Sequence, residues 1–123
     1  MIYFLIIFSI VAILVFLEVN YSFLQRLSPT EDNRSATALS YVDRGIKKFQ
    51  AGDHKGAIAD YNEALRLKSD CALAFYNRGV VKGKLRDRQG ALVDLNEAAR
   101  LSQQQGQMDD YRRAIALIEL IKN

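Results

Sequence analysis

The sequence has few of the residues that stabilise a small domain without a large hydrophobic core. Its 123 residues include one cysteine, one histidine, one proline and no tryptophan. Cys71 has no second cysteine with which to form an intramolecular disulfide, and Cys71 with His54 is too small a set for a structural zinc site. The sequence therefore indicates neither an oxidising compartment nor a bound metal or other cofactor. Packing, the membrane or partners must stabilise the fold.

Charged side chains are absent from the start of the chain. The run from Met1 to Leu17 is apolar apart from Ser9, and all 17 Lys and Arg and all 14 Asp and Glu follow it, starting at Glu18. In hydrocarbon every backbone polar group needs an internal partner, so this run predicts a transmembrane helix. To reach the thickness of a bilayer the helix must continue to about Leu24. We expect residues 1–24 to contact lipid and residues 1–27 to form the whole anchor.

A cleaved secretory signal is the alternative for this segment. No Lys or Arg precedes the apolar run and no A-x-A sequence follows it, which favours an uncleaved, single-pass anchor. Arg26 and Arg34 lie just after the run, so the positive-inside rule places the N-terminus outside and the C-terminal domain in the cytoplasm. Residues 28–37, SPTEDNRSAT, contain Pro29 and no large apolar side chain, which predicts a polar tether before a domain that begins near Ala38.

The domain contains an internal repeat. GIKKFQAGDHKGAIADYNEALRL aligns with GVVKGKLRDRQGALVDLNEAARL, pairing Gly45 with Gly79 and Leu67 with Leu101 at an offset of 34 (79 − 45 = 101 − 67). A 34-residue period with small residues at fixed places resembles the tetratricopeptide repeat (TPR), a helix-turn-helix unit that stacks into an α-solenoid. The YNRG string of residues 76–79, with Lys82 behind it, resembles a variant common in photosynthetic bacteria.

The apolar run, the polar segment and the TPR resemblance together predict an all-α fold with a transmembrane helix at 1–27, a tether at 28–37, TPR repeats at 38–71 and 72–105, and a C-terminal capping helix within 106–123. The helical periodicity predicts helices near residues 38–51, 54–68, 72–85, 88–102 and 108–122. Aspartates should cap three of them, namely Asp53, Asp70 and Asp87. Because repeat arrays usually need three or more units, five helices favour stabilisation by self-association or by a larger complex.

The repeats depart from the usual TPR pattern at charged positions. Arg44 and Arg78 stand where the family has a large apolar residue, and Lys48 and Lys82 stand where it has an aromatic one. Their aliphatic stems can still cover apolar surface. Carboxylates also recur at equivalent places in the second helices, and we interpret them as a solvated face rather than as a catalytic pair: Asp60, Glu63, Asp94 and Glu97.

The sequence offers no catalytic constellation. The single histidine falls at a predicted turn, the glycines are spaced for helix packing rather than for a phosphate loop, and Cys71 between the repeats is interpreted as a small packing residue. We therefore expect a protein that is not an enzyme.

Three surfaces remain as candidate binding sites. The TPR resemblance implies a concave groove lined by the first helix of each repeat: Leu39, Val42, Ile46, Phe49, Leu73, Tyr76, Asn77, Val80 and Lys84. Because Val42 and Ile46 occupy places where some TPR proteins carry the Lys and Asn that clamp a C-terminal carboxylate, we expect an apolar helix or extended segment instead. The second surface is a basic patch formed by Lys82, Lys84, Arg86 and Arg88. The third is a C-terminal apolar surface at Leu117 and Leu120, which widen the apolar stripe of the last helix.

These features predict a non-catalytic, membrane-anchored protein-protein interaction scaffold, an accessory subunit or assembly factor of a complex in a plasma or thylakoid membrane. One alternative is a small structural subunit held mainly through its transmembrane helix. Another is a peripheral protein whose basic patch binds anionic lipid or an acidic partner. The same four residues would also be compatible with an ordinary solvated turn that binds nothing. Mixed charge elsewhere in the domain argues against nucleic-acid binding.

Overall fold

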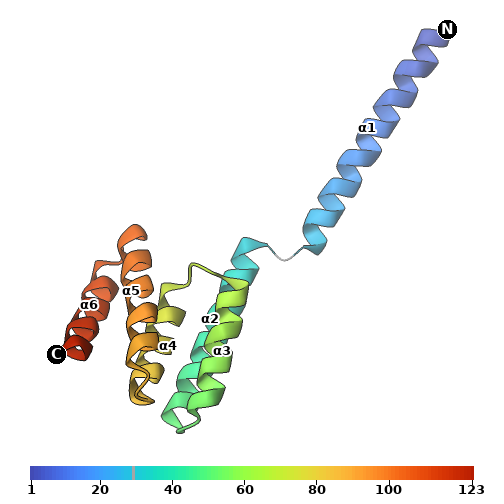
Figure 1. The fold of residues 1–123 in the computed structure, drawn as a ribbon. Helices are drawn as coiled ribbons and strands as arrows, with labels where there is room; N and C mark the ends of the chain where they lie inside the picture. Colours follow the sequence, from blue (N-terminus) through green and yellow to red (C-terminus); the bar gives the residue numbers. More distant parts are fainter. Residues whose placement is uncertain (29) are drawn as a thin grey trace. The chain divides into compact units, whose positions relative to one another are not determined.

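The computed structural model describes residues 1–28 and 30–123, and all regular structure in this part of the chain is helical. Two compact units can be distinguished, residues 1–33 and residues 34–123, and each is described by itself (Figure 1). The helices are α1 (Ile2–Leu27), α2 (Glu31–Gln50), α3 (His54–Leu67), α4 (Ala72–Lys84), α5 (Arg88–Gln104) and α6 (Met108–Lys122).

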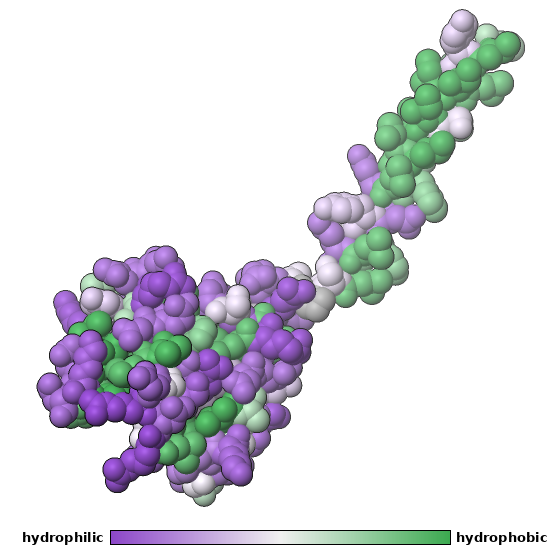
Figure 2. Space-filling view, in the orientation of Figure 1, coloured by the Kyte–Doolittle hydropathy of each residue, from purple (hydrophilic) through white to green (hydrophobic). Residues whose placement is uncertain are grey.

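Helix α1 is 26 residues long and none of its side chains is buried. A window of 18 residues near the N-terminus has a mean hydropathy of 2.8 and is long and apolar enough to cross a membrane; a signal sequence would meet the same criterion. Figure 2 shows hydrophobic residues over most of this helix and hydrophilic ones towards its C-terminal end. Its last turn ends at Ser28, whose extended backbone (φ −77°, ψ 136°) donates to the carbonyl of Leu24. Pro29, where the sequence predicts a break, lies outside the described residues.

Helix α2 begins earlier than the sequence predicts. It starts at Glu31 rather than near Ala38, so residues 31–37, which we expected to belong to a polar tether, are helical. Thr30 explains the start, because its Oγ1 accepts a hydrogen bond from the backbone N–H of Asn33 at 3.2 Å. Glu31 and Asp32 then lie in the first turn, where negative charge stabilises a helix through its dipole.

Helices α2 and α3, and likewise α4 and α5, form antiparallel pairs, and α6 packs against α5. Glycine permits the close approach within each pair. A Cβ on Gly45 would lie 2.6 Å from Cε1 of Tyr61, and a Cβ on Gly79 would lie 2.9 Å from Cγ of Leu95. The repeated glycine of the sequence is therefore the point at which a large side chain of the second helix lies directly on the backbone of the first.

Two of the three predicted aspartate caps are confirmed. Asp53 accepts a hydrogen bond from the N–H of Gly56, and Asp87 accepts one from the N–H of Gly90, both at 2.9 Å. The prediction for Asp70 is wrong, because the residue at the N-cap of α4 is Cys71, which provides no side-chain hydrogen bond. Asp70 lies one residue too early and its carboxylate pairs instead with Lys68 at 2.9 Å.

The apolar core of the domain consists of two clusters, one shared by α2, α3 and α4 and one centred on the contact between α5 and α6. The first includes Tyr61 and the buried thiol of Cys71, which is a packing residue as predicted. In the second, Ala114 and Ile118 of α6 pack with Leu95, Ala98 and Ala99 of α5. Helix α6 thus covers the side of α5 that would otherwise be open.

Candidate functional site: the groove lined by α2, α4 and α6

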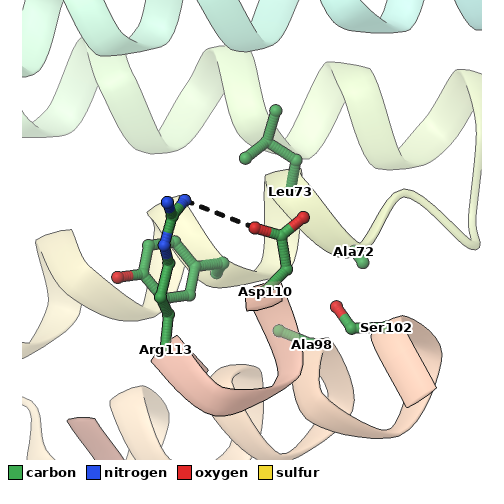
Figure 3. Close-up of a pocket in the computed structure, with 7 residues that line it drawn as sticks. Ala72, Leu73, Ala98, Ser102, Asp110 and Arg113 are labelled. Atoms are coloured by element: carbon green, nitrogen blue, oxygen red, sulfur yellow. Dashed lines mark hydrogen bonds and ion pairs between the residues drawn. The ribbon is translucent and has the colours of Figure 1, made fainter. Parts of the chain in front are cut away.

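The first helices of successive repeats, α2 and α4, share a groove with α6. It has a volume of about 250 Å³ and includes Leu39 of α2, Leu73 of α4 and Asp110 of α6. A smaller, more enclosed cavity of about 40 Å³, which we call the anchor pocket, shares Leu73 and Asp110 with it. The anchor pocket is lined by Ala72, Leu73, Tyr76, Ala98, Ser102, Asp110 and Arg113 (Figure 3).

The predicted groove residues fall into two groups. Leu39 and Leu73 are 47% and 42% exposed, and both line the groove. Val42 does not belong there, because it is 0% exposed and packs in the core of the first repeat. Ile46 and Phe49 also pack against that core, and the ring of Phe49 lies 5.3 Å from that of His54. The TPR resemblance thus implied the right helix but not which of its neighbouring apolar positions turns towards the core.

The predicted residues on α4 are more accessible. Tyr76 lines the anchor pocket, while Asn77 and Val80 are partly exposed and Lys84 is exposed. The amide of Asn77 donates a hydrogen bond to the carbonyl of Leu73 at 2.8 Å, one turn earlier in the same helix.

Sequence reasoning missed the polar part of the groove. Asp110 and Arg113 are one turn apart on α6, with Arg113 Nη1 3.4 Å from Asp110 Oδ1, and Figure 3 shows them across the pocket from Leu73. The steps from 110 to 113, 117 and 120 follow one face of a helix. The predicted C-terminal apolar surface, Leu117 and Leu120, therefore shares a helix face with the groove. Leu120 is 72% exposed, whereas Leu117 packs partly against the second core cluster.

The carboxylates that we expected on a solvated face include two that are buried. Asp94 is 1% exposed, and its two oxygens accept from Arg78 at 2.7 and 2.8 Å and pair with Lys82 at 2.9 Å. Asp60 is 3% exposed and binds Arg44 and Lys48 in the same manner. The solvated interpretation is thus wrong for both aspartates. It does describe Glu63 and Glu97 better, since each is partly exposed and pairs with the arginine three residues later.

These ion triads explain the charged departures from the usual TPR pattern. Arg78 additionally donates to Asn62 Oδ1 at 2.7 Å, so it joins α4 to both α3 and α5. Burial raises the pKa of Asp94, but the hydrogen bonds from Arg78 and Lys82 outweigh it and hold the pKa below its ordinary value. The hydrogen bond with Arg44 likewise lowers the pKa of Asp60. Each triad is ionised at neutral pH and ties the two helices of its repeat together.

The predicted basic patch is smaller than its sequence suggests. Lys82 is engaged by Asp94, and Arg88 donates to the backbone carbonyl of Lys122 at 2.8 Å near the end of α6. Lys84 and Arg86 are exposed. Arg86 has a φ of 67°, the left-handed conformation that Gly52 adopts at the equivalent turn of the first repeat.

The outer faces of the first and last helices of the stack carry other side chains than the faces through which its repeats pack on each other. Cys71, Ala74 and Val81 are buried in the core cluster that contains Val42 and Tyr61, but the residues 34 positions earlier (37, 40 and 47) are Thr, Ser and Lys. Ile115 of α6 and Gly79 of α4 both lie eight residues after the N-cap of their helix. Where Gly79 allows the second helix of its repeat to approach closely, Ile115 carries a large side chain.

No group of three or more His, Cys, Asp or Glu side chains within residues 1–28 and 30–123 is arranged to hold a metal ion. The charged side chains Asp70 and Asp110 of the groove each pair with a basic residue, Lys68 and Arg113 respectively.

Comparison with known proteins supports a TPR-like fold. Residues 45–85 match the family described as TPR repeat. Among solved structures, the chain resembles the second TPR of Spaghetti (RPAP3), determined bound to the HSP90 peptide SRMEEVD, with a TM-score of 0.54 and 20% sequence identity. That similarity covers 74% of this chain and 96% of the other. No curated protein sequence matches this one significantly. The domain therefore has an all-helical, TPR-like fold.

Proposed function

We propose that this protein is a non-catalytic, membrane-anchored scaffold that binds a segment of a partner protein in the groove lined by α2, α4 and α6. The observation that carries the proposal is the exposure of Leu39 and Leu73 beside an enclosed pocket. TPR repeats are typically protein-interaction modules, and the similar TPR of Spaghetti is bound to a peptide. An accessory subunit or assembly factor of a membrane complex would combine such a groove with an apolar N-terminal helix.

The polarity of the remaining surface supports the groove as the binding site. Elsewhere in the domain, exposed large apolar side chains such as Val93 on α5 and Leu85 after α4 line neither the groove nor the anchor pocket. Isolated apolar residues of this kind are normal on soluble surfaces, whereas contiguous ones beside a cavity are typical of partner sites. A partner segment with apolar side chains would cover Leu39, Leu73 and Tyr76 together.

Crosslinking followed by purification in mild detergent tests the groove. We expect Leu39→Ser and Leu73→Ser to reduce the recovery of crosslinked partners severalfold, because each removes exposed apolar area without touching the core. Val93→Ser is the matched control, since Val93 is 66% exposed on α5 and lies outside the groove. Equal recovery with all three variants would exclude the groove as the binding surface.

The anchor is tested separately, by extraction of membranes at alkaline pH. We propose that α1 spans the bilayer with the domain on the cytoplasmic side, so the full chain should remain with the lipid. Val15→Arg places a charge in the middle of the apolar run, which costs about 3 kcal/mol for membrane insertion, and should release part of the protein. If the unaltered chain is released completely, α1 does not span the membrane.

An alternative function assigns partner binding to α1 itself, and its fully exposed apolar surface is the observation in favour. Replacing residues 1–24 with an unrelated transmembrane segment distinguishes the two proposals. Association through the groove should survive the exchange and remain sensitive to Leu39→Ser. Association that disappears with the exchange and ignores Leu39→Ser would identify α1 as the binding element.

A further inference from the structure

We infer that the anchor pocket binds a serine or threonine side chain of the partner segment. The inference rests on the proposed function, because the pocket opens beside the groove in which that segment would lie. It adds a chemical requirement that apolar contacts in the groove alone would not impose.

The size of the pocket limits the side chain that it can accept. Its volume is about 40 Å³. One water needs about 10–15 Å³ on this measure, so the pocket has room for about three non-hydrogen atoms. Threonine has three such atoms beyond Cα and serine has two, whereas leucine, phenylalanine and lysine have more. The small size of Ala72, Ala98 and Ser102 creates this space, since larger residues at these positions would fill it.

The polar atoms of the pocket favour a hydroxyl group. Ser102 is only 2% exposed and its hydroxyl makes no hydrogen bond to any described residue. Asp110 offers carboxylate oxygens at the rim, and Arg113 offers guanidinium donors beside them. A hydroxyl can donate to Asp110 while it accepts from Ser102, which no purely apolar side chain can do. A carboxylate side chain would meet the negative charge of Asp110.

The apolar side of the anchor pocket should favour threonine over other small polar side chains. Ala72 and Ala98 are 6% and 1% exposed and border the same cavity as Ser102. The methyl group of a threonine would pack there while its hydroxyl faces Asp110. We therefore expect threonine to bind more tightly than serine, and both to bind more tightly than valine, which fits the space but leaves the polar atoms unpaired.

A random peptide library selected against the full chain in detergent micelles tests the inference. We expect the selected peptides to share one position restricted to threonine or serine. Replacing that residue by valine should weaken binding about tenfold, the effect of losing a hydrogen bond to a charged group. Ser102→Val fills the pocket and should weaken the threonine peptides at least as much. Ser102→Ala keeps the space open and should reduce the preference for threonine over valine.

The controls separate this inference from the proposed function. Ser40→Val makes the same chemical change on an exposed part of α2 and should leave affinity unchanged. Leu39→Ser alters the groove without lining the anchor pocket, so it should weaken every groove-binding peptide. If Leu39→Ser weakens binding but Ser102→Val does not, or no hydroxyl position emerges, the pocket inference is wrong and the groove stands. If no peptide binds, or Leu39→Ser has no effect, both fail.

Discussion

The buried ion triad of the second repeat should make Asp94 one of the most sensitive positions in the domain. Asp94→Asn keeps the shape of the side chain but removes the charge that Arg78 and Lys82 share. Breaking a buried ion pair costs about 3–5 kcal/mol, because the remaining charge is left without a partner. Arg78 and Lys82 retain 19% and 24% side-chain exposure, so water partly compensates them. We therefore expect a loss of about 3 kcal/mol in the free energy of unfolding.

Asp60→Asn is the matched variant in the first repeat. Its partners Arg44 and Lys48 are 57% and 35% exposed, so solvent screens the pair and the loss should be only about 1 kcal/mol. Urea unfolding of the full chain in mild detergent, followed by far-UV circular dichroism, measures both variants. Equal losses for the two, or a loss below about 1 kcal/mol for Asp94→Asn, would refute the argument from burial.

The same triad predicts a pH dependence. The pKa of Asp94 in the folded protein lies below its ordinary value of 3.8. Its contribution to stability is therefore complete above about pH 4 and is lost as the pH falls through the folded pKa. The difference in unfolding free energy between the original protein and Asp94→Asn should be constant from neutral pH down to about pH 5 and shrink below pH 4. A difference that stays unchanged under acid conditions would show that the charge of Asp94 is not the cause.

The remaining predictions concern packing, turn geometry and alkaline pH, and urea or spectroscopic titration tests each of them. Gly45→Ala should lower the free energy of unfolding by about 1–2 kcal/mol, because the added Cβ would lie 2.6 Å from Tyr61. Gly83→Ala should raise it by up to about 1 kcal/mol, because its Cβ would meet nothing closer than 3.9 Å. The reverse order would refute the close-packing argument. Arg86→Gly should stabilise the domain by about 0.5–1 kcal/mol, since arginine is strained at a φ of 67°; a loss would mean that the Arg86 side chain contributes more than its backbone costs. Burial raises the pKa of Tyr61 to about 12. Stability should therefore fall as the pH rises from about 10 towards 12, and titration of all tyrosines near 10 in the folded protein would contradict this.

The second-helix pattern shows why the fold was predictable and the triads were not. Gly45 and Gly79 recur at one spacing, which fixes where two helices approach, and the helix bounds of the repeats agree with the prediction within about two residues except at the start of α2. Asp60 and Asp94 recur at the same spacing, and repetition alone favours a solvated face. Their burial could have been inferred from Arg44 and Arg78, each 16 positions earlier, at places where an apolar residue is usual. The sequence does not show that Arg44 faces Asp60 or that Arg78 faces Asp94, and that knowledge is needed to pair them.

The groove was predicted in part for a related reason. The TPR resemblance implied Leu39, Val42 and Leu73 alike as groove residues, but Val42, three residues from Leu39, is buried in the core. Ser102, Asp110 and Arg113 were not expected at all, since nothing in their local sequence marks them as neighbours of Tyr76. They come together because α4, α5 and α6 all border the anchor pocket: Ser102 lies on α5, and Asp110 and Arg113 lie on α6, more than 30 positions after Tyr76.

The sequence by itself determined the features that depend on local periodicity: an apolar helix at the N-terminus, a 34-residue repeat, and turns capped by Asp53 and Asp87. Backbone hydrogen bonding, apolar spacing and capping act over a few residues, so the linear order contains the information. The tertiary structure alone decided which charges are buried and which side chains share a cavity. Those properties depend on the packing of α4 against α3 and α5 and of α6 against α5, because desolvation and ion pairing arise only when separate helices remove water from the same place.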